Sequence, residues 1–195
     1  MSNVKLSATE LALASNADIL LTKNTIINKV YTIFGHLSVA YAQEIKTCIL
    51  PTDIIMPSAK ISRGENYRGL PWVMLDYPRC FSGENIFSIR TMFWWGNYFS
   101  QFLFLKGKFL MPNVVDKVSQ QSCKEYFLGC NTDPWQHHFE QDNMVVIRNY
   151  TSPQISNQIH HLDFLKLGTK IPIERWESVE NFMTNNFKKF LEIAL

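Results

Sequence analysis

Residues 86–106, "IFSIRTMFWWGNYFSQFLFLK", decide the fold class of this chain. Two apolar runs flank Gly96-Asn97, a dipeptide typical of a two-residue β-turn. The pattern predicts a hairpin in which Trp95 pairs with Tyr98. Both faces of such a hairpin are largely apolar, which is unusual for antiparallel strands with one face in solvent. We expect one face to pack on helices and the other to meet further helices, a second subunit or a ligand.

Helical patterns stand on both sides of the hairpin. The capping box that starts at Ser7 predicts a helix over 7–22, and Asn24 is expected to cap the next one. Proline and glycine bound the later helices. These are expected over 112–123, over 152–167 with a stop at Gly168, and from Pro172 to the end of the chain. The second helix shows the clearest apolar stripe, made of Ile26, Val30, Ile33, Phe34, Leu37, Tyr41 and Ile45.

Two shorter apolar runs complete the expected sheet, one closed by Pro78 and one reading "MVVIR". Because the helices are segregated from the strands along the chain, the fold class is α+β. At 195 residues the chain fits one domain, 1–195. The prediction is an antiparallel four-stranded sheet (about 70–77, 86–95, 98–106 and 144–148) packed with N-terminal and C-terminal helices.

The amino-acid composition limits the kinds of partner and function that this chain can have. Apolar residues at 46% and charged residues at 18% exclude wholesale disorder, and a net charge of +2 without a nucleic-acid-binding motif argues against nucleic acid as a partner. The longest apolar run, 92–105, is too short and too polar to span a bilayer, so no membrane partner is expected. No signal peptide is recognisable, which predicts a cytoplasmic protein whose four cysteines are thiols.

The second face of the hairpin is the first candidate site. In the expected register Arg90 stands opposite Leu103 and diagonal to Gln101. A charge on an apolar face needs a partner, which is either Asp76 on the preceding strand or an anionic ligand held by Arg90 and Gln101. The large side chains of this face, Trp94, Phe99 and Leu103, would form an interface in a homodimer or with a protein partner.

The stretch "RGENYRG", 63–69, is the second candidate. It is expected to be a loop before a strand, in which Arg63 and Arg68 form one cluster. It lacks the spacing of a phosphate-binding loop. The alternatives are a surface loop with internal salt bridges and a site that binds an anionic small molecule.

The third candidate is "NTDPWQHHFEQDN", 131–143. If this stretch is extended, Trp135, His137 and Phe139 point to one side, and His138 and Glu140 share the other. His137, His138 and Glu140 are therefore weak candidates for catalytic groups, and the shared side of His138 and Glu140 could suit a metal ion or a proton shuttle. Adjacent histidines diverge, and no cysteine spacing fits a metal, so the sequence predicts neither a metal site nor a cofactor.

Two functions remain open at this stage. The favoured one is a non-enzymatic binding or interaction module that uses the aromatic hairpin face and the arginine-rich loop. The alternative is a small-molecule enzyme or ligand-binding protein that recognises an anionic group through Arg68 and Arg90, with His137 or His138 as acid/base. Absence of the common catalytic motifs favours the first.

Overall fold

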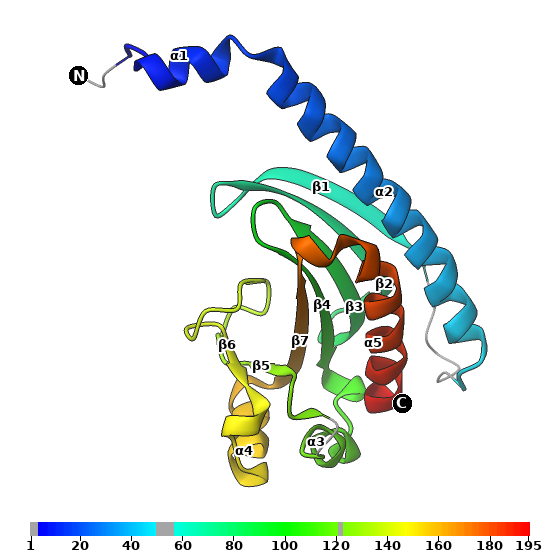
Figure 1. The fold of residues 1–195 in the computed structure, drawn as a ribbon. Coiled ribbons are helices and arrows are strands. Elements are labelled where there is room, and N and C mark those ends of the chain that lie inside the picture. Colours follow the sequence, from blue (N-terminus) through cyan, green and yellow to red (C-terminus); the bar gives the residue numbers. More distant parts are fainter. Residues whose placement is uncertain (1–3, 50–56, 121–122) are drawn as a thin grey trace.

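The computed structural model describes residues 4–49, 57–120 and 123–195, and the fold is α+β as predicted. Its sheet is antiparallel, but it has seven strands in the order β1-β2-β3-β4-β7-β5-β6 instead of four (Figure 1). The strands are β1 Lys60–Tyr67, β2 Leu70–Ser82, β3 Asn85–Trp94, β4 Tyr98–Lys106, β5 Phe127–Gly129, β6 Met144–Val146 and β7 Phe164–Pro172. The α-helices are α1 Ala8–Ala14, α2 Ala17–Lys46, α3 Pro112–Val118, α4 Ser152–Leu162 and α5 Val179–Ala194, and short 3-10 turns include η1 Gly107–Phe109, η3 Ile147–Asn149 and η4 Ile173–Ser178.

One face of the sheet carries the main core. The helices α2 and α5 lie against it, and the predicted apolar stripe of α2 is buried except for the partly buried Ile26 (Figure 1). The rings of Tyr41 in α2 and Phe187 in α5 stack in parallel with centroids 3.9 Å apart. A fully buried aromatic pair contributes packing beyond its area alone, so this stack joins the two helices to each other.

The N-terminal helices differ from the prediction. The break does not lie at residues 22–24 but at Ser15-Asn16, and α2 then runs without interruption for 30 residues, about 45 Å. The Asn16 side chain accepts a hydrogen bond from the backbone of Asp18 and so caps α2. Residues 4–22, here called the arm, are exposed and extend beyond the sheet (Figure 1).

The hairpin forms where it was predicted, but its register differs by one residue. Trp94, not Trp95, pairs with Tyr98, so the turn contains three residues, with Gly96 at φ +71°. A shift of one residue exchanges the faces of one strand relative to the other. Arg90 therefore lies opposite Phe102, and Gln101 points to the helix-covered face.

The structure differs from the prediction at the first two strands. Residues 60–67 form β1, an edge strand, where a loop was expected. The strand β2 does not end before Pro78, because the register with β3 shifts between Asp76 and Arg79. A proline that cannot donate to the ladder is tolerated at such a bulge.

The strand β7 occupies residues 164–172, which the sequence analysis assigned to the end of one helix, a stop at Gly168 and the start of the last helix. The helix α4 ends at Leu162, followed by Asp163 in the left-handed conformation at φ +57°. Gly168, predicted to stop the helix, lies within β7 opposite Phe102. A Cβ on Gly168 would lie 3.0 Å from Cε1 of Phe102, so this glycine makes room for an aromatic ring on the neighbouring strand. The C-terminal α-helix accordingly starts at Val179, not near Pro172.

Candidate functional site

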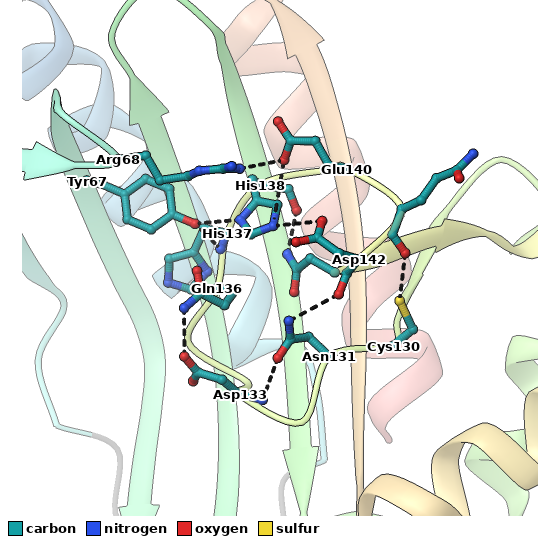
Figure 2. Close-up of polar contacts among 12 residues, drawn as sticks. Tyr67, Arg68, Cys130, Asn131, Asp133, Gln136, His137, His138, Glu140 and Asp142 are labelled. Atoms are coloured by element: carbon teal, nitrogen blue, oxygen red, sulfur yellow. Dashed lines mark hydrogen bonds and ion pairs between the residues drawn. The ribbon is translucent and has the colours of Figure 1, made fainter.

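Residues 130–143, here called the covering segment, lie over the face of the sheet opposite to α2 and α5. The two ends of the segment are joined by a hydrogen bond from the Cys130 backbone N–H to the Asn143 carbonyl, 2.9 Å. Side chains alternate along it as the sequence predicted. The rings of Trp135 and Phe139 contact the sheet, whereas His138 lies with Glu140 (Figure 2).

Aromatic contacts hold the covering segment in place. The ring of Trp135 meets Phe104 edge-on at 5.5 Å between centroids, and the ring of Phe139 stacks on Phe102 at 5.4 Å. Phe139 also meets Tyr98 edge-on at 5.3 Å. Because these partners all lie on β4, the covering segment fills the apolar face that the sequence left without an occupant.

Arg90 is the main polar contact between the sheet and the covering segment. Its Nε and Nη2 atoms donate to the two carboxylate oxygens of Asp76, at 2.6 and 3.0 Å, and its Nη1 lies 2.9 Å from Nε2 of His137. The predicted Arg90–Asp76 pair is thus present. An arginine can only donate, so Nε2 of His137 accepts and its proton is on Nδ1.

A second basic side chain, Lys166, is buried on this side of the segment beside Arg90 and His137. Lys166 on β7 donates from Nζ to the carbonyls of Pro134 and Gln136. Burial, assisted by the charge of Arg90, lowers the pKa of Lys166 from its usual 10.5 to about 7. Burial lowers the pKa of His137 well below its ordinary value, and Lys166 and Arg90 act in the same direction. His137 is therefore neutral at pH 7.

On its outer side the covering segment gathers oxygen and nitrogen atoms that can bind a metal. Nε2 of His138 lies 3.2 Å from Oδ1 of Asp142 and 3.7 Å from Oε2 of Glu140, and all three atoms lie within 4.8 Å of one another. The His138 side chain is 5% exposed, whereas the two carboxylates are largely in solvent. The cluster is thus a buried imidazole that faces an open acidic rim (Figure 2).

Tyr67 at the end of β1 fixes the His138 ring from the other side. Its Oη lies 3.2 Å from Nδ1 of His138 and accepts the backbone N–H of His137 at 2.6 Å (Figure 2). Burial raises the pKa of Tyr67, so the hydroxyl stays protonated at neutral pH. The sequence analysis did not predict this contact, because Tyr67 and His137 are 70 residues apart in the chain.

The candidate arginines do not form one cluster. Arg68, in the turn between β1 and β2, donates from Nη1 to Oε2 of Glu140 at 2.8 Å. Arg63 is exposed on β1 opposite Val73, whose side chain belongs to the helix-covered core. Paired residues share a face, so Arg63 and Arg68 serve opposite sides of the sheet. The expected Arg63–Arg68 cluster was therefore wrong.

The remaining residues that were predicted to bind a ligand or a partner are buried in the protein interior. Gln101 is buried and donates from Nε2 to the Tyr41 hydroxyl at 2.6 Å, on the helix side of the sheet and apart from Arg90. Phe99 and Leu103 belong to the main core, and Trp94 is 4% exposed in a small cluster with Met74 and Met92. A partner would contact these three side chains only if the residues that cover them moved away.

A separate apolar pocket of about 460 Å³ opens at the root of the arm. It lies between α2, the turn after β3, and η4. The ring of Trp176 in its wall is packed edge-on against Phe99 at 5.3 Å, which makes that wall rigid. The sequence did not indicate this pocket because its walls come from three distant segments. Its lining is Ile26, Lys29, Phe93, Trp95, Gly96, Ile173, Trp176 and Glu177.

Comparison of the chain with protein-family models, with curated proteins and with solved structures finds no match. In the described part of the chain no helix is both long and apolar enough to cross a membrane. The four cysteines form no disulfide. The function must therefore be argued from the geometry itself.

Proposed function

We propose that this chain is a protein-interaction module that associates with a second copy of itself through the arm. The observation that carries the proposal is the exposure of the arm. The helix α1 has no buried residue, and among the residues that the structure describes, seven of the eleven exposed large apolar side chains lie between residues 4 and 21. They are Val4, Leu6, Leu11, Leu13, Ile19, Leu20 and Leu21.

Such a surface is costly in water. Burial of one leucine or isoleucine side chain contributes about 1.5–3 kcal/mol, so seven exposed side chains within one short segment represent a large apolar area that contact with a partner could bury. Propensity alone does not explain a short helix such as α1, because isolated helices under about 12 residues are marginal in water. Contact with a partner supplies the missing burial.

The apolar pocket supports a second copy as that partner. Ile26 and Lys29 of α2 line it, one to two turns beyond Leu21, where the exposed part of α2 ends. An antiparallel arm from another copy, laid along α2, would bring its own leucines to this pocket. The same contact would then form twice around a two-fold axis, as in most homodimers.

The charges of the arm favour a protein over a lipid surface. Residues 4–22 contain one basic side chain, Lys5, and two acidic ones, Glu10 and Asp18, so the arm has a net charge of −1. Helices that bind anionic membranes are rich in lysine and arginine, whereas this arm is slightly acidic. Charges of both signs also let two antiparallel arms place opposite charges near each other.

The test is the mass of the purified chain in solution, measured by light scattering over a range of concentrations. We expect a dimer that dissociates on dilution. Leu11→Glu with Leu20→Glu should give a monomer that still unfolds cooperatively, because neither side chain packs on the body. Val39→Glu is the matched control: Val39 is equally exposed, at 60%, but lies on the part of α2 that packs on the sheet.

Two outcomes would contradict the proposal. If the wild type is a monomer at every concentration, a second copy of the chain is not the partner that binds the arm. Binding of the wild type to uncharged lipid vesicles, lost in the Leu11→Glu, Leu20→Glu variant, would show that the arm is a membrane anchor instead.

A further inference from the structure

We propose that His138, Glu140 and Asp142 form a binding site for a divalent transition-metal ion of the zinc type, independent of the arm. The three ligand atoms come from alternate residues of one short segment. A cation with ligands at about 2.0–2.2 Å holds neighbouring ligands roughly 3–3.5 Å apart. The Nε2–Oδ1 separation of 3.2 Å and the Nε2–Oε2 separation of 3.7 Å are close to that spacing.

The nitrogen that faces the two carboxylates must present to them either its own proton or a shared metal ion, because ionised carboxylates only accept hydrogen bonds. If Tyr67 donates its hydroxyl proton to Nδ1 of His138, then Nε2 carries the proton. If instead Nδ1 donates to Tyr67, the lone pair on Nε2 is directed at both carboxylates and suits a metal ion.

The contacts behind His138 are those of an oriented ligand. Tyr67 contacts the far nitrogen of the ring, the usual arrangement for a metal-binding histidine. The Asn143 side chain donates to the His138 carbonyl, and the neighbouring His137 is held by Arg90. The ring is therefore fixed before any ion arrives, so little ordering entropy opposes binding.

The open rim decides the class of ion. One imidazole with two carboxylates suits zinc, cobalt or manganese better than magnesium, which prefers oxygen ligands alone. Because both carboxylates are largely exposed, water can occupy the remaining coordination positions. The alternation along the segment already placed His138 and Glu140 on one side; the structure adds Asp142, two residues further along, as the third group.

The experiment is a calorimetric titration of the full chain, previously treated with a chelator, with Zn²⁺. We expect a single equivalent per chain. Glu140→Gln and Asp142→Asn should each weaken binding at least about tenfold, and both changes are at exposed side chains that leave the fold intact. Tyr67→Phe should weaken binding about 10–100-fold through loss of orientation. His160→Gln, at an exposed histidine on α4, should bind Zn²⁺ as the wild type does.

A second titration with Co²⁺ identifies the ligands. Oxygen and nitrogen ligands give visible d–d bands without thiolate-to-cobalt charge transfer. Charge-transfer bands would assign the ion to a cysteine, and unchanged affinity in the Glu140→Gln, Asp142→Asn double variant would place it elsewhere. Equal affinity for Mg²⁺ and Zn²⁺ would show that the carboxylates attract any divalent cation and that no site selective for transition metals exists. Each of these three results would overturn the proposal.

Discussion

Nη1 of Arg90 donates a hydrogen bond to Nε2 of His137 across 2.9 Å, and the same guanidinium binds both oxygens of Asp76. One buried cation thus joins two strands to the covering segment. Its side chain is 17% exposed and that of Asp76 10%. A charge pair removed from water to this extent depends on full satisfaction of its hydrogen bonds.

Arg90→Met should therefore destabilise the protein strongly. The substitution keeps the length of the stem but leaves the Asp76 carboxylate buried without its partner and His137 without its donor. Loss of one member of a buried pair costs about 3–5 kcal/mol. The measurement is the free energy of unfolding from denaturant titration at constant pH.

Arg68→Met is the matched control, because Arg68 also binds a carboxylate, but in solvent. The exposed pair with Glu140 should contribute no more than about 1 kcal/mol. Similar losses in the two variants would mean that Arg90 is not a buried structural ion pair in solution.

The stability of the wild type should rise with pH above neutrality because of Lys166. Its pKa is about 7 in the folded chain and 10.5 unfolded, so between these values the unfolded state binds more protons and stability rises with pH. Below about pH 7 Lys166 is protonated in both the folded and the unfolded state, so it adds no pH dependence to the stability there. The rise is bounded by about 5 kcal/mol for a shift of this size.

Lys166→Met tests this pH dependence. The variant cannot titrate at this position, so its free energy of unfolding should rise less between pH 7 and pH 10 than that of the wild type. Parallel pH profiles of the two proteins would show that the Lys166 pKa is not shifted by folding.

Gly64→Ala should destabilise the chain although alanine is normally the better residue in a strand. The indole of Trp72 on the neighbouring strand lies over Gly64, and a Cβ there would stand 2.6 Å from Cε2 of that ring. Overpacking of this kind costs about 1–3 kcal/mol. Gly35→Ala offers a control in α2: nothing lies within 4 Å of its added Cβ, and we expect a gain of about 0.5–1 kcal/mol. Thermal melts that shift in the same direction for both variants would contradict the Trp72 contact.

Arg68→Gln should tighten Zn²⁺ binding several-fold. In the metal-free chain the Arg68 guanidinium binds Oε2 of Glu140, the oxygen that faces His138. Its positive charge opposes a second cation at that place, and glutamine removes the charge while it retains hydrogen-bonding capacity. The affinity from calorimetry at low salt is the readout. Weaker binding by the variant would show that Arg68 supports the metal ligands and does not compete with the ion.

The sequence predicted local features well. The apolar stripe of α2, the existence of the hairpin and the alternation at 135–140 all depend on residues close in the chain, and all three are present. The hairpin register was wrong because Gly96-Asn97 fits both a two-residue and a three-residue turn, and only distant packing selects between them. The strand β7 was missed because Gly168 predicted a helix stop and because Lys166 and Lys170 interrupt the apolar pattern of the strand. In the structure these two lysines lie over the rings of Phe102 and Phe139.

The position of β7 has a consequence for how the chain is made. β7 is the last strand to be synthesised, yet it pairs with β4 and carries β5 and β6. At about 5–20 residues per second, the ribosome leaves the aromatic edge of β4 without its neighbour for seconds. During that interval the nascent hairpin presents an unpaired edge strand of the kind that aggregates, and it becomes a natural target for chaperones that bind exposed aromatic segments.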